Sequence, residues 1–311
     1  MTEEKINFKV VRDFGEIFNV SVKFLRQNFK LYFLSMLLLA GPFVLLNSFA
    51  SAYNQSVMLD KATMVRAGRL YNASVYGWEY FLTLFTQFIA LLAIMCSNYA
   101  FMIVYSENGI GNFTVRDVAK KINDHFIKIS IGFIVFFVLV TIFAVSIITI
   151  ITMFGSASPV AGVFFAFLFI IAMMLLGPNL LWQLSAAFLV ILSENEIAFS
   201  AFGRTREVMR DNYWWTWLIV VCGTLMIFVF SLFFSLPILA LSWLKMLSNY
   251  SIEEDKTSLI YSSLTIFCSF CATMVYSVLY IICGFHFFSL AEKQDGKGLM
   301  ERINEIGKST A

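Results

Sequence analysis

The sequence predicts an all-α integral membrane protein with six transmembrane helices. Of its 311 residues, 59% are hydrophobic and only 14% are charged, a composition typical of multi-pass membrane proteins and far from that of soluble domains. The hydrophobic residues form six long runs separated by charged stretches. At about 1.5 Å per helical residue, each run can cross about 30 Å of hydrocarbon. A third observation is that the charged stretches repeat a short motif.

The six spans are expected to follow a surface helix at the start of the chain. Residues 1–30 carry too many charges for a signal peptide. From Phe14 to Phe29, apolar residues recur every three or four positions with charged residues between them, which predicts a helix lying in the membrane interface. We expect the spans at residues 31–52, 80–105, 127–154, 160–192, 214–244 and 259–290.

Glycine and proline residues predict where these spans bend or turn. Gly41 and Pro42 predict a kink in the first span. Residues 155–159 predict a tight, uncharged turn between the third and fourth spans. The fourth run is roughly 50 Å long as a helix, which is more than the hydrocarbon needs. This helix must therefore tilt, bend at Gly177 and Pro178, or extend out of the membrane.

A repeated motif predicts three similar units. Ser-Glu-Asn at residues 106–108 recurs at residues 193–195, and His125 and Asn212 follow at the same spacing. A third copy, without Ser-Glu-Asn, ends at residues 26–29. We expect parallel repeats, each an amphipathic surface helix followed by a hairpin of two spans. Within one membrane domain, 1–311, these units are residues 8–106, 107–193 and 194–291, followed by a tail, 292–311, that is helical near residues 299–306.

The charged loops predict the orientation of the chain. Of the 22 Lys and Arg residues, 17 fall in the two terminal segments and the two loops that hold the repeated motif. Lys and Arg collect on the cytoplasmic side of membrane proteins. We therefore expect both termini and all three amphipathic helices to be cytoplasmic.

Each even-numbered span is followed by a carboxylate, which predicts a cluster of charges. Glu107, Glu194 and Glu292 follow the second, fourth and sixth spans. A carboxylate at a helix C-terminus opposes the helix dipole, so each needs a cationic neighbour. Arg26 and Arg210 occupy equivalent positions in the surface helices and are the expected partners. The favoured interpretation is a set of interfacial ion pairs, and the alternative is a cluster that binds an anionic head group or ligand.

The sequence offers no pattern for catalysis. Charged side chains deep in a membrane usually mark function, and none lies well inside a predicted span. No nucleophile, phosphate-loop, metal-ligand or nucleic-acid motif is present. Cys268 and Cys271 have redox spacing but fall inside a span, where a thiol usually packs. We therefore expect no catalytic residue, metal or cofactor.

Polar side chains inside the spans leave transport as an alternative. Transporters bind substrates at interrupted helices with polar groups, and Gln87, Asn98, Asn179 and Gln183 form a possible intramembrane polar site. The glycine and proline breaks fall at different places in the three units. Packing kinks are therefore the favoured interpretation of these breaks.

Two short stretches resemble a known group of proteins. Residues 18–29, which end in Arg-Gln-Asn-Phe, and residues 288–296 followed by 299–303 resemble bacterial multi-pass membrane proteins of poorly defined function. Among these is the membrane domain that accompanies some glycerophosphodiester phosphodiesterases. The resemblance implies a bacterial inner membrane. That family's catalytic domain is a separate soluble barrel with carboxylate metal ligands, which this chain lacks, so the resemblance implies no activity.

Two functional hypotheses follow. The leading one is a non-enzymatic inner-membrane scaffold or accessory subunit that binds the lipid bilayer or a partner membrane protein through its cytoplasmic amphipathic helices. The alternative is a small-molecule or lipid transporter with a cavity between the hairpins. A polar cavity that reaches the middle of the spans would favour transport, whereas a closed bundle with exposed surface helices would favour the scaffold.

Overall fold

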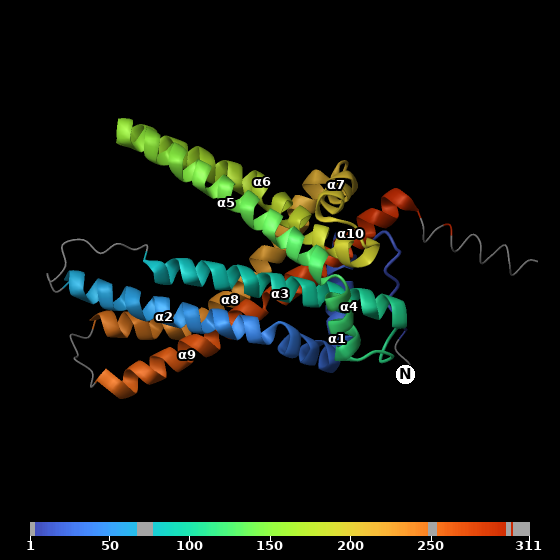
Figure 1. Ribbon diagram of the computed structural model, residues 1–311, viewed down its shortest axis with the longest axis horizontal. Coiled ribbons are helices and arrows are strands. Elements are labelled where there is room, and N and C mark those ends of the chain that lie inside the picture. Colours follow the sequence, from blue (N-terminus) through green and yellow to red (C-terminus); the bar gives the residue numbers. More distant parts are fainter. Residues whose placement is uncertain (1–3, 67–76, 248–253, 297–299, 301–311) are drawn as a thin grey trace, which may run out of the picture. The chain divides into compact units, whose positions relative to one another are not determined.

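The described part of the protein contains only α-helices as regular elements. The computed structural model describes residues 4–66, 77–247, 254–296 and 300; the tail helix expected near residues 299–306 falls outside these residues, Met300 excepted. Five helical stretches are long and apolar enough to cross a membrane, or six if α1 and α2 form one bent span. The helices (Figure 1) are α1 (Phe14–Leu39), α2 (Gly41–Arg66), α3 (Trp78–Asn108), α4 (Val115–Asp124), α5 (Phe126–Ala157), α6 (Pro159–Glu194), α7 (Ala198–Met209), α8 (Tyr213–Leu247), α9 (Glu254–Met274) and α10 (Tyr276–Asp295).

The chain divides into two compact units. Unit 1 comprises Met1–Tyr32, Asn98–Gly223 and Tyr280–Ala311, and unit 2 comprises Phe33–Ser97 and Thr224–Leu279. The boundary falls inside α1, α3, α8 and α10. The limits of these units differ from the limits of the three expected repeats. The repeats stay a prediction.

The surface helix expected at the start of the chain and the first half of the first span form one helix. Helix α1 runs from Phe14 to Leu39 because no glycine or proline interrupts residues 26–39. It ends at Ala40, where α1 and α2 meet at 58°. The kink expected at Gly41 and Pro42 is confirmed, since Pro42 has no N–H and its ring would clash with the preceding helical turn.

Helices α5 and α6 form a hairpin with a very short connection. Only Ser158 lies between them, with extended φ of −159° and ψ of 127°, and the two helices lie side by side (Figure 1). Pro159 suits the first position of α6 because that position needs no N–H donor. The turn is therefore shorter than the expected residues 155–159.

Helix α6 continues through Gly177 and Pro178 without a break. Because Pro178 has no N–H, the carbonyl of Met174 loses its helical partner, and Trp217 Nε1 of α8 donates to this oxygen at 2.9 Å. The Tyr213 hydroxyl donates to the next carbonyl, that of Leu175, at 3.1 Å. These two bonds give Pro178 a role in packing α6 against the start of α8.

The sixth expected span, residues 259–290, consists of two helices. Helices α9 and α10 are separated at Val275, although residues Ile260–Asp295 together satisfy the length and hydropathy of one span. No glycine or proline lies within residues 272–279, so this break cannot be predicted from a helix-breaking residue. In unit 2, α9 packs along α2 (Figure 1).

Candidate functional site

The first described residues, 4–13, form an irregular segment in unit 1 that bends at residues 8–10, and we call it the N-terminal strap. Ile6 and Phe8 are each only 5% exposed, whereas Lys5, Asn7 and Lys9 are exposed. The strap therefore buries one row of side chains in unit 1 and presents the other row outward.

Aromatic side chains of α1, α3 and α10 hold the strap. The ring centroid of Phe8 lies 4.9 Å from that of Phe285 and 5.8 Å from that of Tyr105. The backbone N–H of Ile6 donates to the Tyr105 hydroxyl at 3.1 Å. Phe24 of α1 also meets Phe8, edge to face, at 6.2 Å. Such contacts bury much apolar area and prefer tilted or edge-to-face geometry.

Arg12 fixes the other end of the strap to α10. Its backbone N–H donates to Ser289 Oγ at 2.8 Å, and its guanidinium lies 5.6 Å from the centre of the Phe285 ring. The same guanidinium donates to the carbonyls of Val10 and Asn7. Burial lowers the pKa of Arg12, and Glu16 partly offsets this effect. Arg12 stays charged at neutral pH because its ordinary pKa is so high.

A cavity of about 560 Å³ lies in unit 1, between the strap and the C-terminal ends of three helices. Ser106 belongs to the end of α3, Ser193 and Glu194 to the end of α6, and Glu292 to the last turn of α10. The volume falls within the range usual for small-ligand pockets. The lining consists of Lys5, Ile6, Asn7, Phe8, Lys9, Ser106, Ser193, Glu194, Phe287, Phe288, Ala291, Glu292 and Asp295.

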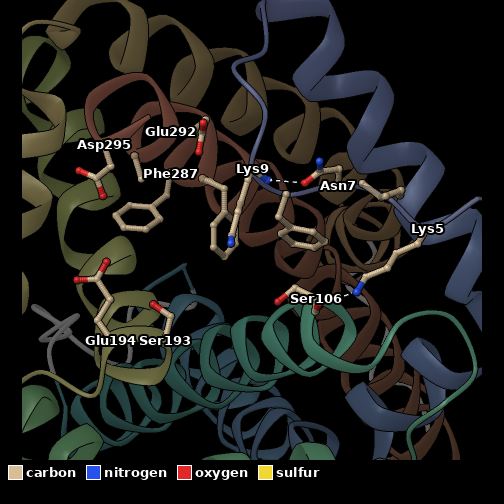
Figure 2. A pocket seen from close by; sticks show the side chains of 13 residues that line it. Lys5, Asn7, Lys9, Ser106, Ser193, Glu194, Phe287, Glu292 and Asp295 are labelled. Atoms are coloured by element: carbon tan, nitrogen blue, oxygen red, sulfur yellow. Dashed lines mark hydrogen bonds between the residues drawn. The ribbon is translucent and has the colours of Figure 1, made fainter. Parts of the chain in front are cut away.

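The charges of the cavity are segregated (Figure 2). Glu194, Glu292 and Asp295 lie on one side, Lys5 lies on the opposite side, and Lys9 lies between them. Glu292 is only 9% exposed. Both lysines come from the strap and all three carboxylates from α6 and α10.

The structure places two of the three carboxylates that follow the even-numbered spans in this cavity. Glu194 and Glu292 line it, while Glu107 does not. Glu107 pairs instead with Lys121 of α4, with 2.8 Å between Nζ and Oε1. Its neighbour Ser106 lines the cavity, so all three helix ends contribute.

Arg204 of α7 joins two of these helix ends. Its Nη2 lies 2.5 Å from Asp295 Oδ2, and its Nε lies 3.8 Å from Glu194 Oε2. The hydrogen bond to Asp295 is the main cause of a raised pKa for Arg204. Arg204 thereby links the ends of α6 and α10 through one side chain.

Glu107 and Glu194 have ion-pair partners other than the expected Arg26 and Arg210. Lys121 and Arg204 take these roles, and both Arg26 and Arg210 are exposed. The reason is geometric: Arg204 shares a face of α7 with the buried residues Ala201 and Val208, whereas Arg210 follows the last residue of α7. Residues three and four apart share a helix face, and the repeat alignment compares sequence positions without regard to faces.

Lysine side chains also reach the carbonyl ends of two helices. Lys5 Nζ donates to the carbonyl of Ser106 at 2.7 Å, near the end of α3. Lys128 Nζ donates to the carbonyl and, at 2.8 Å, to the side-chain oxygen of Asn195, which caps α6. Cations at helix C-termini offset the negative end of the dipole and satisfy free carbonyls.

Of the residues expected to form an intramembrane polar site, Asn98, Asn179 and Gln183 lie in unit 1 and Gln87 lies in unit 2. Gln87 lies in unit 2, where Asn47 Nδ2 donates to its Oε1 at 2.7 Å. Asn98 lies in unit 1 and accepts a hydrogen bond from the Tyr32 hydroxyl. Such bonds between helices are common packing contacts in membranes. Gln87 and Asn98 thus serve separate helix contacts.

Asn179 and Gln183 belong to a second buried polar cluster in unit 1. Gln183 Nε2 lies 3.6 Å from Met209 Sδ. Trp182 lies between Asn179 and Gln183 in the sequence, and its ring centroid is 5.4 Å from that of His286. His286 Nε2 is 2.9 Å from the Thr216 hydroxyl. Within the described residues, the amide atoms of Asn179, Trp182 Nε1 and His286 Nδ1 are buried without a hydrogen-bond partner.

Sequence reasoning missed the strap and the lysine side of the cavity. The available signal was the alternation of apolar and polar residues from Lys5 to Lys9, which is the pattern of an extended segment with one buried side. Within the described ranges, no group of His, Cys, Asp and Glu side chains could hold a metal ion. The chain matches no known protein family, no curated protein and no solved structure.

Proposed function

We propose that this protein is a non-enzymatic integral membrane scaffold or accessory subunit. Its cytoplasmic side, made of the ends of α3, α6 and α10 with the strap and α7, binds lipid head groups or a partner protein. The observation that carries the proposal is the position of the cavity. It is lined by residues where helices end, as suits a docking site at the membrane surface better than a transport path through the spans.

Exposed apolar side chains support insertion in a bilayer. Phe164, Phe167 and Met174 of α6 are 55%, 59% and 65% exposed, and an apolar surface of this kind needs an apolar environment. Lipid tails supply one. The same argument applies along α5, where none of the residues between 133 and 156 whose exposure is described is buried.

Charge supports a cytoplasmic position for the cavity. Residues 1–30, 107–128, 193–213 and 292–311, which include the strap, α4, α7 and the end of α10, hold 17 of the 22 Lys and Arg residues. Helix α4 buries Val118 while Arg116 and Lys120 are exposed, so it can face anionic head groups with its basic residues. The proposed setting is a bacterial inner membrane, which the resemblance to bacterial multi-pass proteins implies.

Site-directed labelling tests the orientation. Single cysteines replace Asn7, Asn112 and Ser200 on the proposed cytoplasmic side, and Asp60 on the other; all four positions are exposed. A membrane-impermeant maleimide should label the first three only in inverted vesicles and Asp60→Cys only in intact cells. Labelling of Asn7→Cys from outside the cell would overturn the proposed cytoplasmic docking surface.

A transporter is the second candidate, because the cluster around Asn179 and His286 holds buried polar atoms without partners. In a scaffold, Asn179→Leu removes an unpaired amide and should raise stability by about 1 kcal/mol. Asn98→Leu breaks the bond from Tyr32 and should lower stability by a similar amount. Equilibrium unfolding in mixed micelles measures both. If the Asn179→Leu protein supports growth as well as the wild-type protein in cells that lack the original gene, the transporter hypothesis loses its main support.

A further inference from the structure

We propose that the outward face of α1 binds anionic phospholipids of the cytoplasmic leaflet through Lys23, Arg26 and Lys30. These three residues, which we call the basic stripe, are all exposed, and none of them lines the cavity. The inference rests on the proposed function, since it needs a cytoplasmic N-terminus. It adds a second binding surface and the class of lipid that this surface takes.

The basic stripe lies opposite the side of α1 that packs within unit 1. Four residues spaced three or four apart form that packed side, each with an exposed fraction of 5% or less: Ile17, Ser21, Phe24 and Asn28. The residues of the stripe have the same spacing but are offset from this row by about half a turn, because each helical residue rotates the side chain by about 100°. The stripe therefore faces away from the packed side.

No carboxylate neutralises the basic stripe within the described part of the chain. From Ile17 to Leu39, α1 contains no acidic residue. The three cations of the stripe form none of the ion pairs within residues 4–66, 77–247 and 254–296. On α7, by contrast, Arg206 is followed directly by Glu207. The stripe thus presents three positive charges that can meet the phosphates of a membrane surface.

The basic stripe ends where α1 becomes apolar. One helical turn beyond Lys30, the same side of the helix carries Phe33 and Leu34, which are 58% and 46% exposed. One turn further, it carries Leu37, which is 40% exposed. Exposed cations followed directly by exposed apolar residues are expected where a helix passes from the head groups into hydrocarbon. The stripe therefore lies at the depth of the lipid phosphates.

Apolar side chains beside the basic stripe favour a lipid surface over an acidic segment of a partner protein. Val22 and Phe29 directly precede Lys23 and Lys30, and each is 63% exposed. Apolar residues next to cations can enter the boundary between head groups and acyl chains, while the long basic side chains reach the phosphates. The anionic lipids of a cytoplasmic leaflet attract basic residues held at this position.

The test is a titration of the purified full-length protein in neutral detergent micelles with phosphatidylglycerol or phosphatidylcholine, followed by native mass spectrometry. We expect phosphatidylglycerol to bind at least about tenfold more tightly, because each Lys or Arg near an anionic surface contributes roughly fivefold in affinity. This preference should weaken as salt is added, since exposed charges are screened. Equal affinity for the two lipids would overturn the proposal.

Matched variants test the residues of the basic stripe. The triple variant K23Q/R26Q/K30Q should lose the preference for phosphatidylglycerol, whereas K23R/R26K/K30R keeps the charges and should keep the preference. K23Q alone should lower the affinity for phosphatidylglycerol about fivefold. R206Q also removes one exposed cation, but it should leave the affinity unchanged because Glu207 lies beside Arg206. A preference that survives in the triple glutamine variant would overturn the proposal.

The maleimide labelling separates failure of this inference from failure of the proposed function. If Asn7→Cys is labelled only in inverted vesicles and phosphatidylglycerol shows no preference, the lipid specificity of the basic stripe is rejected and the cytoplasmic scaffold stands. Labelling of Asn7→Cys from outside the cell would reject both. The substituted side chains are exposed, so the variants should unfold as the wild type does, and K23Q carries the test if the triple variant fails to fold.

Discussion

The two halves of α6, on either side of Pro178, differ in their surroundings. Before Pro178, most side chains are exposed and apolar; after Leu181, nearly every residue up to Leu192 is buried. The second half also carries the polar residues Asn179, Trp182 and Gln183 and ends at the cavity with Glu194. An exposed apolar half suits lipid contact, so the first half of α6 fits the proposed contact with the bilayer, whereas the second half packs against protein.

The largest effect on stability is expected when one aromatic side chain is truncated in each half of α6. Trp182 is fully buried, whereas Phe167 is 59% exposed. Truncation of a buried Trp to Ala typically costs about 3–5 kcal/mol, since it loses packing and leaves a cavity. We expect a loss of this size for Trp182→Ala and almost none for Phe167→Ala, both measured by equilibrium unfolding in mixed micelles. Similar losses for the two variants would show that the first half is also packed against protein.

The next largest loss of stability is expected in the strap, because the strap covers the cavity at which the second half of α6 ends. Phe8→Ala removes a ring that contacts Phe285 and Tyr105 and should cost about 3 kcal/mol. The control is Val11→Ala, since Val11 is 52% exposed. Limited proteolysis of the strap, together with unfolding, measures the change. A strap that resists protease equally in both variants would contradict the proposed role of Phe8.

A smaller loss of stability is expected at Pro178, where the two halves of α6 meet. Trp217→Phe removes the donor to the Met174 carbonyl and should cost about 1 kcal/mol. Pro178→Ala supplies a backbone N–H for the same carbonyl. In the double variant, the loss caused by Trp217→Phe should therefore shrink. A double-mutant cycle measures this coupling, and strictly additive effects would show that the indole bond does not replace the missing helical bond.

Some of these features follow from the sequence for identifiable reasons. Long apolar runs specify membrane-length helices because the spacing of backbone groups is fixed, and Pro42 specifies a helix break because its ring excludes a helical turn. The approach of Glu194 and Glu292 to one cavity was anticipated only as a shared charge cluster, from the equivalent positions of these residues in the repeats.

Other features depend on tertiary contacts that a pattern does not contain. The strap is short and carries only a few apolar residues, so its burial depends on the rings of α3 and α10 that receive Phe8. The break at Val275 has no local breaker in the sequence. The choice of Arg204 over Arg210 depends on which face of α7 packs, and residue type alone cannot decide that.

The smallest expected effect concerns α4, which lies outside α6 and tests whether surface helices are stabilised locally. The backbone N–H and hydroxyl of Thr114 donate to Asp117 Oδ2 at 2.7 and 2.8 Å, which closes the N-terminus of α4. These bonds lower the pKa of Asp117 from its ordinary value of 3.8. A group whose pKa is lowered by folding stabilises the fold above its unfolded pKa and loses this contribution as the pH falls through the folded value.

Amide exchange of α4, corrected for its intrinsic rate, should therefore show constant protection above about pH 4 and a decrease below the ordinary pKa of 3.8. Asp117→Asn should reduce protection at neutral pH and remove its pH dependence. Asp124→Asn, at the far end of α4, should retain the wild-type profile because it does not contact Thr114. If Asp117→Asn kept the wild-type profile, α4 would depend on its packing through Val118 rather than on its own N-terminal bonds. Packing against the rest of the protein would then stabilise α4 as it stabilises the second half of α6.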